Sequence, residues 1–135
     1  MDAATHSKLV LIADDEAVHR MLMRRALTKT FSDFEILEVN SAAEARKVLS
    51  RLLAKMRLVI LDFNLGDGCG LELLREIRAT KEGQGLPCII VSTSDHARDI
   101  WESYKAGCNA YLIKSEDPEH YQACLISAVR FFLSF

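Results

Sequence analysis

The sequence has no long apolar run and no block of like charges, and each absence excludes a class of protein. Its longest apolar stretches are strand-length runs such as residues 9–13 (LVLIA), far short of the roughly 20 residues that span a bilayer. The N-terminus lacks the apolar core of a signal peptide. The net charge of -2 at pH 7 gives no broad attraction to nucleic acid or to an anionic membrane. We therefore expect a cytoplasmic protein that binds neither nucleic acid nor membrane directly.

Paired cysteines, internal repeats and low-complexity linkers are missing too. No two of the four cysteines form a Cys-x-x-Cys pair, so zinc and disulfide chemistry have little support. We interpret them as reduced thiols, mostly packed: Cys69, Cys88, Cys108 and Cys124. Half of the 135 residues are hydrophobic, and this length and composition suit one domain with a real core. We expect residues 1–135 to form that single domain.

Two periodicities alternate along the chain. Short β-rich runs predict five strands, at residues 9–13, 34–39, 58–61, 88–91 and 110–113. Between them, apolar residues recur at helical spacing. They are Val18, Leu22 and Ala26; Ala45, Val48, Leu49 and Leu52; Leu71, Leu74 and Ile77; and Ala97, Ile100, Trp101 and Tyr104. A last helix follows the fifth strand.

Capping residues sharpen the helix boundaries, because a side-chain oxygen can accept hydrogen bonds from the unpaired amides that open a helix. Ser41 with Glu44 forms a capping box. Asp117 before Pro118 suits a helix start, and Gly107 suits a left-handed helix stop. For the fourth helix, we expect Ser94 or Asp95 to be the N-cap.

Five alternating strands and helices imply right-handed crossovers and a parallel sheet covered by helices on both faces. The expected fold class is α/β, a doubly wound five-stranded parallel sheet. In such sheets, ligands bind at the carboxyl ends of the strands where the strand order reverses. For the order 2-1-3-4-5, this point lies between the first and third strands.

Acidic residues follow the two strands that meet at this point. The first strand runs into Asp14, Asp15 and Glu16, and the third ends at Asp62. Like charges roughly 4 Å apart repel by about 4 kcal/mol at an effective dielectric constant near 20, so such a cluster favours a divalent cation. Oxygen ligands favour magnesium or manganese over zinc. The alternative is that the acids after the first strand only complement the dipole of the first helix.

The ends of the fourth and fifth strands carry groups that suit a phosphate. Ser92 offers a hydroxyl, and Lys114 offers a compact cation for a phosphate or a carboxylate. The alternatives are that Ser92 only caps a helix and that Lys114 is a solvated surface lysine.

On these residues, the sequence resembles the receiver domain of two-component response regulators over essentially its whole length. The resemblance rests on Asp14-Asp15, on residues 61–65 (LDFNL) with residues 68–74 (GCGLELL), and on Ser92, Tyr111 and Lys114. It implies a flavodoxin-like receiver fold. It also implies a stand-alone response regulator without an output domain, which is a phosphoryl-accepting switch with at most slow autodephosphorylation rather than an enzyme.

The resemblance also assigns roles to residues. Asp62 would accept a phosphoryl group from a sensor histidine kinase. Asp15, Asp62 and the backbone carbonyl of Asn64 would bind Mg²⁺ directly, and Asp14 would bind it through water. Lys114 would pair with Asp62 or its phosphoryl group, and Ser92 and Tyr111 would form the switch.

Two positions depart from the usual receiver pattern. Ser115 stands where most receivers have a proline after the lysine, often with a cis bond, and a cis bond before a non-proline residue costs about 2.5 to 4 kcal/mol. The geometry around Lys114 is therefore an open question. Gly66 replaces another common proline, which makes its loop more permissive.

A narrower resemblance is to phytochrome-associated single-domain regulators. It rests on residues 92–94 (STS), 108–111 (CNAY) and 114–115 (KS), on Asp99, Ile100, Ser103 and Tyr104, and on the aromatic C-terminus. It implies a light-sensing histidine kinase as phosphodonor and a homodimer.

The last helix favours a homodimer independently, because it is apolar over most of its circumference. Tyr121, Leu125, Ala128 and Phe132 form one stripe, which Ile126, Val129 and Leu133 extend. The alternative is a tail that folds back on its own sheet. Arg20, Arg24 and Arg25 on the first helix form either a docking face for a phosphotransfer partner or a solvated basic face.

The sequence is also compatible with other functions. One is a degenerate receiver that acts as an interaction module without phosphorylation. Another is a Mg²⁺-dependent phosphohydrolase with an aspartyl-phosphate intermediate, although such enzymes typically carry a second acid two residues after the nucleophile, where this sequence has Asn64. A flavodoxin-like cofactor binder is disfavoured because acids stand where a phosphate-binding loop is expected.

Overall fold

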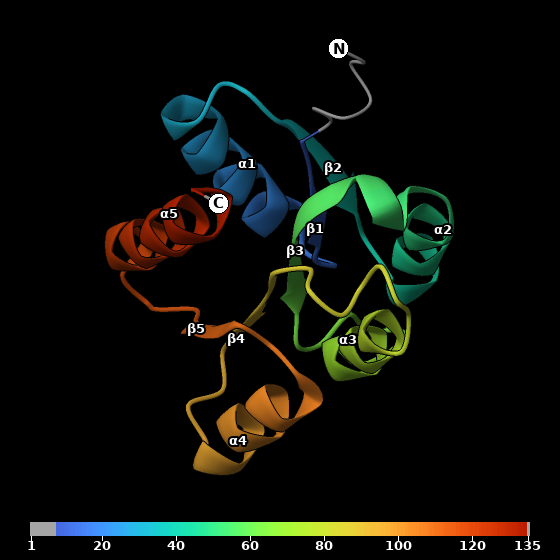
Figure 1. The fold of residues 1–135 in the computed structure, drawn as a ribbon. Coiled ribbons are helices and arrows are strands. Elements are labelled where there is room, and N and C mark those ends of the chain that lie inside the picture. The colour runs from blue at the N-terminus through green and yellow to red at the C-terminus, as the bar shows by residue number, and fades with distance from the viewer. Residues whose placement is uncertain (1–7, 135) are drawn as a thin grey trace.

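The computed structural model describes residues 8–134, which form one sheet between two layers of helices (Figure 1). The five strands are β1 (Leu9–Ala13), β2 (Glu35–Val39), β3 (Met56–Asp62), β4 (Cys88–Ser92) and β5 (Ala110–Ile113). The helices are α1 (Ala17–Thr30), α2 (Ala42–Leu52), α3 (Gly70–Arg78), α4 (Ala97–Ala106) and α5 (Pro118–Leu133), and a short 3-10 turn, η2 (Leu53–Lys55), precedes β3. The strands are parallel in the order β2-β1-β3-β4-β5, which confirms the predicted fold class.

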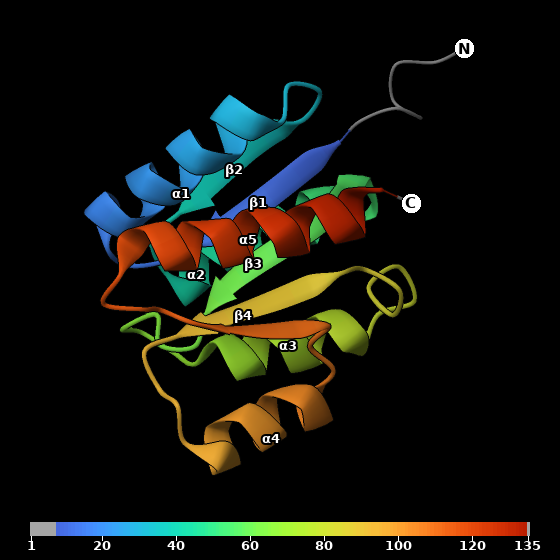
Figure 2. The ribbon, with the colours of Figure 1, turned by 90° about the vertical axis from the view of Figure 1, so that its left-hand side faces the viewer.

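Alternate residues of the central strands feed two separate cores, because successive side chains of a strand point to opposite faces. On β1, Val10 and Ile12 join α1 and α5. Leu11 and Ala13 point to the other face and join α2 and α3. Figure 2 shows α1 and α5 together on one side of the sheet and α3 with α4 on the other. β1, β3 and β4 are buried almost throughout, as continuous apolar runs require.

Strand register aligns the carboxyl ends. Ala13 pairs with Leu61, Asp62 pairs with Val91, and Ser92 pairs with Ile113. β3 extends from residue 56 to 62, beyond the expected 58–61, and so carries Asp62 within the ladder. The residues after β1, β3, β4 and β5 therefore meet at one edge of the sheet.

Most predicted helix boundaries are confirmed. The Ser41 side chain accepts the Glu44 amide at 3.1 Å, Asp117 accepts the Glu119 amide at 3.1 Å, and Gly107 ends α4 with a φ of 108°. The N-cap of α4 was predicted wrongly. It is His96, which makes no side-chain capping bond. Ser94 lies two residues earlier, where its hydroxyl accepts the His96 amide at 3.2 Å and donates to the Asp99 carboxylate.

The inward faces of two helices also differ from the expected ones. On α1, Val18 is 65% exposed, whereas Met23 and Leu27 are buried. The sequence offers two adjacent stripes, and packing against α5 selects the one that contains His19, Met23 and Leu27. On α4, Trp101 and Tyr104 are exposed, because this helix lies beside the edge strand β5 and covers little of the core.

The last helix buries a slightly rotated stripe. Tyr121, Leu125 and Val129 are buried, whereas Ala128 and Phe132 are only partly buried against the core. In the described part of the chain, no helix is both long and apolar enough to cross a membrane.

Candidate functional site

Four carboxylates converge at the carboxyl edge of the sheet. Each of Asp14, Asp15, Glu16 and Asp62 offers an oxygen, and these oxygens all lie within 4.8 Å of one another. Asp14 and Asp62 are buried, whereas Asp15 and Glu16 are exposed. The convergence predicted from the two strand ends is therefore confirmed.

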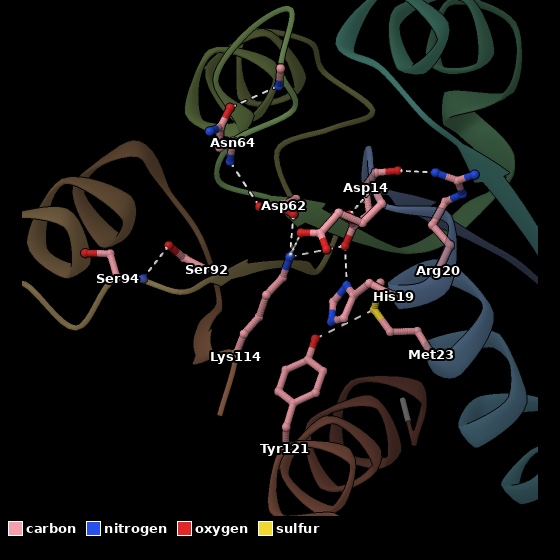
Figure 3. A network of polar contacts seen from close by, with 12 residues as sticks. Asp14, His19, Arg20, Met23, Asp62, Asn64, Ser92, Ser94, Lys114 and Tyr121 are labelled. Carbon is pink, nitrogen blue, oxygen red and sulfur yellow. Dashed lines mark hydrogen bonds and ion pairs between the residues drawn. The ribbon is translucent and has the colours of Figure 1, made fainter. Parts of the chain in front are cut away.

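Asp62 is held by one donor on each oxygen. The Lys114 ammonium lies 2.6 Å from Oδ2, and the Asn64 amide donates to Oδ1 at 3.0 Å, as Figure 3 shows. Burial raises the pKa of Asp62, and the nearby charge of Asp14 raises it further, although Lys114 and the Asn64 amide oppose the rise. Burial works against the charge of Lys114 as well, but the contact with Asp62 outweighs it and raises the pKa of the ammonium. The Lys114 ammonium and the Asp62 carboxylate therefore lie at ion-pair distance, and each group shifts the pKa of the other.

Asp14 is held by donors from three places. The Glu16 amide donates to Oδ1 at 2.9 Å, the His19 Nδ1 contacts Oδ2, and Lys114 lies 3.4 Å from Oδ2. Burial tends to raise the pKa of Asp14, but the bonds from His19 and Glu16 and the charge of Lys114 together lower it. This buried carboxylate is therefore an anion beside Asp62.

The cluster suits a hard divalent cation. One ammonium faces four carboxylates, and Lys114 is already shared between Asp62, Asp14 and, at 3.9 Å, Glu16. The exposed Asp15 and Glu16 leave one side of the cluster open to solvent. Carboxylate oxygens in this number and spacing match the ligands that magnesium and manganese prefer. The donor set thus fits the expected ion.

Ser92 lies at the end of β4, and its carbonyl accepts the Lys114 amide at 2.7 Å. This bond ties the two strand ends together and positions Lys114. The Ser92 hydroxyl accepts the Ser94 amide at 3.0 Å, so it is engaged in the loop after β4. The Tyr111 hydroxyl reaches the same loop and donates to the Ser94 carbonyl at 2.8 Å.

The two departures from the usual pattern have structural outcomes. The described residues contain no cis peptide bond, so Lys114–Ser115 is trans, and Lys114 still reaches Asp62. Gly66 has a φ of 81°, a conformation that proline cannot adopt. Its amide donates to the Asn64 side chain at 3.0 Å, which closes the loop after Asp62.

Two polar residues at the site were missed by the sequence reasoning. One is His19, which contacts Asp14. The sequence feature that could have placed it on the inward face of α1 is the four-residue spacing of His19, Met23 and Leu27. Asp67 accepts the amides of Ala42 and Ala43 at 2.7 and 3.1 Å and so joins the loop after β3 to the start of α2. The signal for Asp67 was a turn-forming acid between two glycines.

Two of the three arginines considered for a docking face form internal contacts instead. Arg20 donates to the Asp14 carbonyl at 2.6 Å and lies 3.6 Å from the Glu38 carboxylate. Arg24 binds Glu38 and the Ile36 carbonyl. These two side chains tie α1 to β2, which argues against a merely solvated face.

All four cysteines are free, as predicted. Cys88 and Cys108 are buried, whereas Cys69 and Cys124 are half-buried. Burial raises the pKa of the Cys88 and Cys108 thiols to about 11, which makes both inert at neutral pH.

Comparison with known proteins agrees with this geometry. Residues 10–126 match the response regulator receiver domain family. The chain is 30% identical over 110 residues to a chemotaxis protein CheY homolog of Campylobacter jejuni, covering 82% of this chain and 83% of that protein. It is 26% identical over 121 residues to response regulator Rcp1 of Synechocystis, covering 86% and 82%.

Solved structures agree as well. The phosphorylated cyanobacterial phytochrome response regulator RcpA superposes with a TM-score of 0.85 at 28% identity, covering 96% of this chain and 95% of that one. The Mn²⁺-bound form of Rcp1 has a TM-score of 0.84 at 24% identity and covers 93% and 94%. Together with the family match, the sheet order and the acidic edge, these likenesses show that the chain belongs to the response regulator receiver domain family.

Proposed function

We propose that the chain is a phosphoryl-accepting switch in which Asp62 receives a phosphoryl group from the phosphohistidine of a sensor histidine kinase. The observation that carries the proposal is the contact of 2.6 Å between Lys114 Nζ and Asp62 Oδ2 inside the acidic cluster. A carboxylate held by a single ammonium keeps lone pairs for a nucleophilic attack, and the same ammonium is available to the product.

The chemistry follows from this arrangement. An oxygen of Asp62 attacks the phosphorus in line, a P–O bond forms, the P–N bond to the donor imidazole breaks, and the imidazole leaves with its electron pair and takes a proton. Lys114 stays within reach of the phosphoryl oxygens and offsets their charge. The Asn64 amide holds the other Asp62 oxygen and fixes the direction of attack.

We propose that Asp15, Asp62 and the backbone carbonyl of Asn64 hold Mg²⁺ directly, with Asp14 acting through water. Manganese is the alternative ion. When bound, the cation neutralises charge on the transferring phosphoryl group. Asp15 is the exposed ligand and Asp14 the buried one, so the ion would enter from the side of Asp15.

The switch would involve Ser92 and Tyr111. Their contacts with the loop after β4 define one state of that loop, and a phosphoryl group on Asp62 would draw the Ser92 hydroxyl away from the Ser94 amide. Tyr111 would then leave the Ser94 carbonyl and turn inward. To change the ratio of the two loop states from 1:99 to 99:1, phosphorylation must stabilise one state over the other by about 5.5 kcal/mol. One charge-assisted hydrogen bond supplies only about 1.5–3 kcal/mol. Lys114 and the loop therefore contribute.

We also propose that the kinase that phosphorylates this receiver is of the phytochrome type. The support for the kinase is the likeness to RcpA, whose name gives it as a phytochrome response regulator.

A homodimer through α5 belongs to the same proposal. Tyr121, Leu125 and Val129 already pack on the core, yet Phe131 is 59% exposed at the end of this helix. Light scattering at increasing concentration should give twice the monomer mass, and Phe131→Glu should give the monomer mass. A monomer at all concentrations would contradict the homodimer and leave the proposed phosphorylation of Asp62 unaffected.

The test of the switch is phosphorylation by a small-molecule donor such as acetyl phosphate with Mg²⁺. Mass spectrometry of the intact protein should show one added phosphoryl group, stable in acid and labile in base. Asp62→Asn should remain unmodified. The proposal fails if the wild-type protein acquires no phosphoryl group or if Asp62→Asn acquires one equally well.

The same reaction separates the two alternatives when the released phosphate is measured together with the protein mass. An interaction module that works without phosphorylation would gain no phosphoryl group, and a phosphohydrolase would release phosphate from the donor in many turnovers. The structure disfavours the phosphohydrolase, because Asn64 is not an acid and its side-chain oxygen accepts the Gly66 amide.

A further inference from the structure

His19 lies behind the acidic cluster, on the first turn of α1, and has no part in the proposed chemistry. Its Nδ1 contacts Asp14 Oδ2, the oxygen that also faces Lys114. Asp14 is fully buried, so few other groups can reach it. His19 is therefore one of the few side chains that fix where this carboxylate points.

The other side of the imidazole is enclosed. Within the described part of the chain, Nε2 is buried and makes no hydrogen bond, so the contact with Asp14 sets the orientation of the ring. The ring centroid lies 5.4 Å from that of Tyr121, with the planes tilted by 31°. Tyr121 is a buried residue of α5, and its hydroxyl points to the Met23 sulfur.

Figure 3 shows these groups as a line from the cluster to α5: Asp14, then His19, then Tyr121. A side chain that orients a carboxylate of a metal site from behind acts on the ion without touching it. Loss of a group that orients a directly bound ligand typically weakens binding about 10–100-fold, and Asp14 would act through water, so we expect the lower end of this range for His19. An aromatic ring packed against the orienting side chain limits the rotamers of that side chain. Loss of the ring should therefore also weaken metal binding.

We propose that His19 is a positioning residue for the metal site and that Tyr121 buttresses it, so that Mg²⁺ binding is coupled to the packing of α5. This inference rests on the proposed metal site. Such coupling is reciprocal. If a packing change at α5 that moves Tyr121 alters the affinity for Mg²⁺ by some factor, then Mg²⁺ alters the packing equilibrium by the same factor.

The test is calorimetric titration of Mg²⁺ into the unphosphorylated protein at one fixed neutral pH. His19→Leu removes the donor, whereas His19→Asn retains an amide that can reach Asp14 from the Nδ1 position. We expect His19→Leu to weaken binding about tenfold and His19→Asn to restore most of the loss. Leu27→Val, a core truncation two turns further along α1, should lower the melting temperature and leave the affinity for Mg²⁺ unchanged.

The coupling to α5 is tested by a double-mutant cycle. Tyr121→Leu should weaken Mg²⁺ binding in the wild-type background and have little further effect in His19→Leu, while Tyr121→Phe, which keeps the ring, should bind as the wild type does. Additive losses would overturn the buttressing role. Wild-type affinity in His19→Leu, or an equal loss in Leu27→Val, would overturn the positioning role.

A failure of the metal site itself gives a different result. If the wild-type protein binds no Mg²⁺, or if Asp15→Asn binds it as well as the wild type does, the proposed site is wrong. If the wild type binds Mg²⁺ and Asp15→Asn does not, while His19→Leu is unaffected, only the inference about His19 is wrong.

Discussion

Lys114 Nζ lies 2.6 Å from Asp62 Oδ2 and 3.4 Å from Asp14 Oδ2, so one ammonium is shared by the two buried carboxylates. Asp14 follows β1, Asp62 ends β3, and Lys114 follows β5. Lys114 therefore offsets part of the negative charge of the cluster, and a divalent cation would offset the charge that remains.

The first prediction concerns the loss of that ammonium. Lys114→Met leaves two buried anions without their shared partner, and breaking one side of a buried pair costs about 3–5 kcal/mol. We expect a lower melting temperature without metal and a larger rise on adding Mg²⁺ than in the wild type, because the ion replaces the lost positive charge. Differential scanning fluorimetry with and without Mg²⁺ measures both. Equal rises in the two proteins would contradict the shared role of Lys114.

The second prediction concerns pH and Asp67. The hydrogen bonds from the Ala42 and Ala43 amides lower the pKa of this carboxyl from its ordinary value of 3.8. The stability that they contribute is therefore present above that value and is lost as the pH falls through the lower folded-state pKa. Asp67→Ala should melt below the wild type near neutral pH, and the difference should shrink in acid. Melting curves across the acid range test this, and a difference that is independent of pH would contradict it.

The third prediction concerns the turn at Gly66. Its φ of 81° favours glycine, and an added Cβ would lie 3.4 Å from Asp15 Oδ2. Gly66→Ala should lower the free energy of unfolding by about 1–2 kcal/mol, the cost of the left-handed conformation. Gly66→Pro should cost more, because it also removes the amide that binds Asn64. Urea unfolding measures both variants, and a neutral Gly66→Pro would show that the loop adopts another conformation.

The fourth prediction concerns the thiols. Iodoacetamide at neutral pH should modify Cys69 and Cys124 in the folded protein and spare Cys88 and Cys108, whose pKa is raised to about 11 by burial. Peptide mass spectrometry locates the modified residues. All four should react after unfolding in urea, and rapid modification of Cys88 in the folded state would contradict the buried assignment.

The alternation of strands and helices could be predicted from the sequence alone, and with it the parallel sheet and the edge where Asp62 meets the acids after β1. These features depend on local periodicity and on the rule that parallel strands share a carboxyl end. Tertiary structure decided which of two adjacent stripes on α1 faces inward, because α5 packs there, and this choice brought His19 to Asp14. It also decided that Lys114 reaches two carboxylates at once, since this depends on how separate strands are aligned in space.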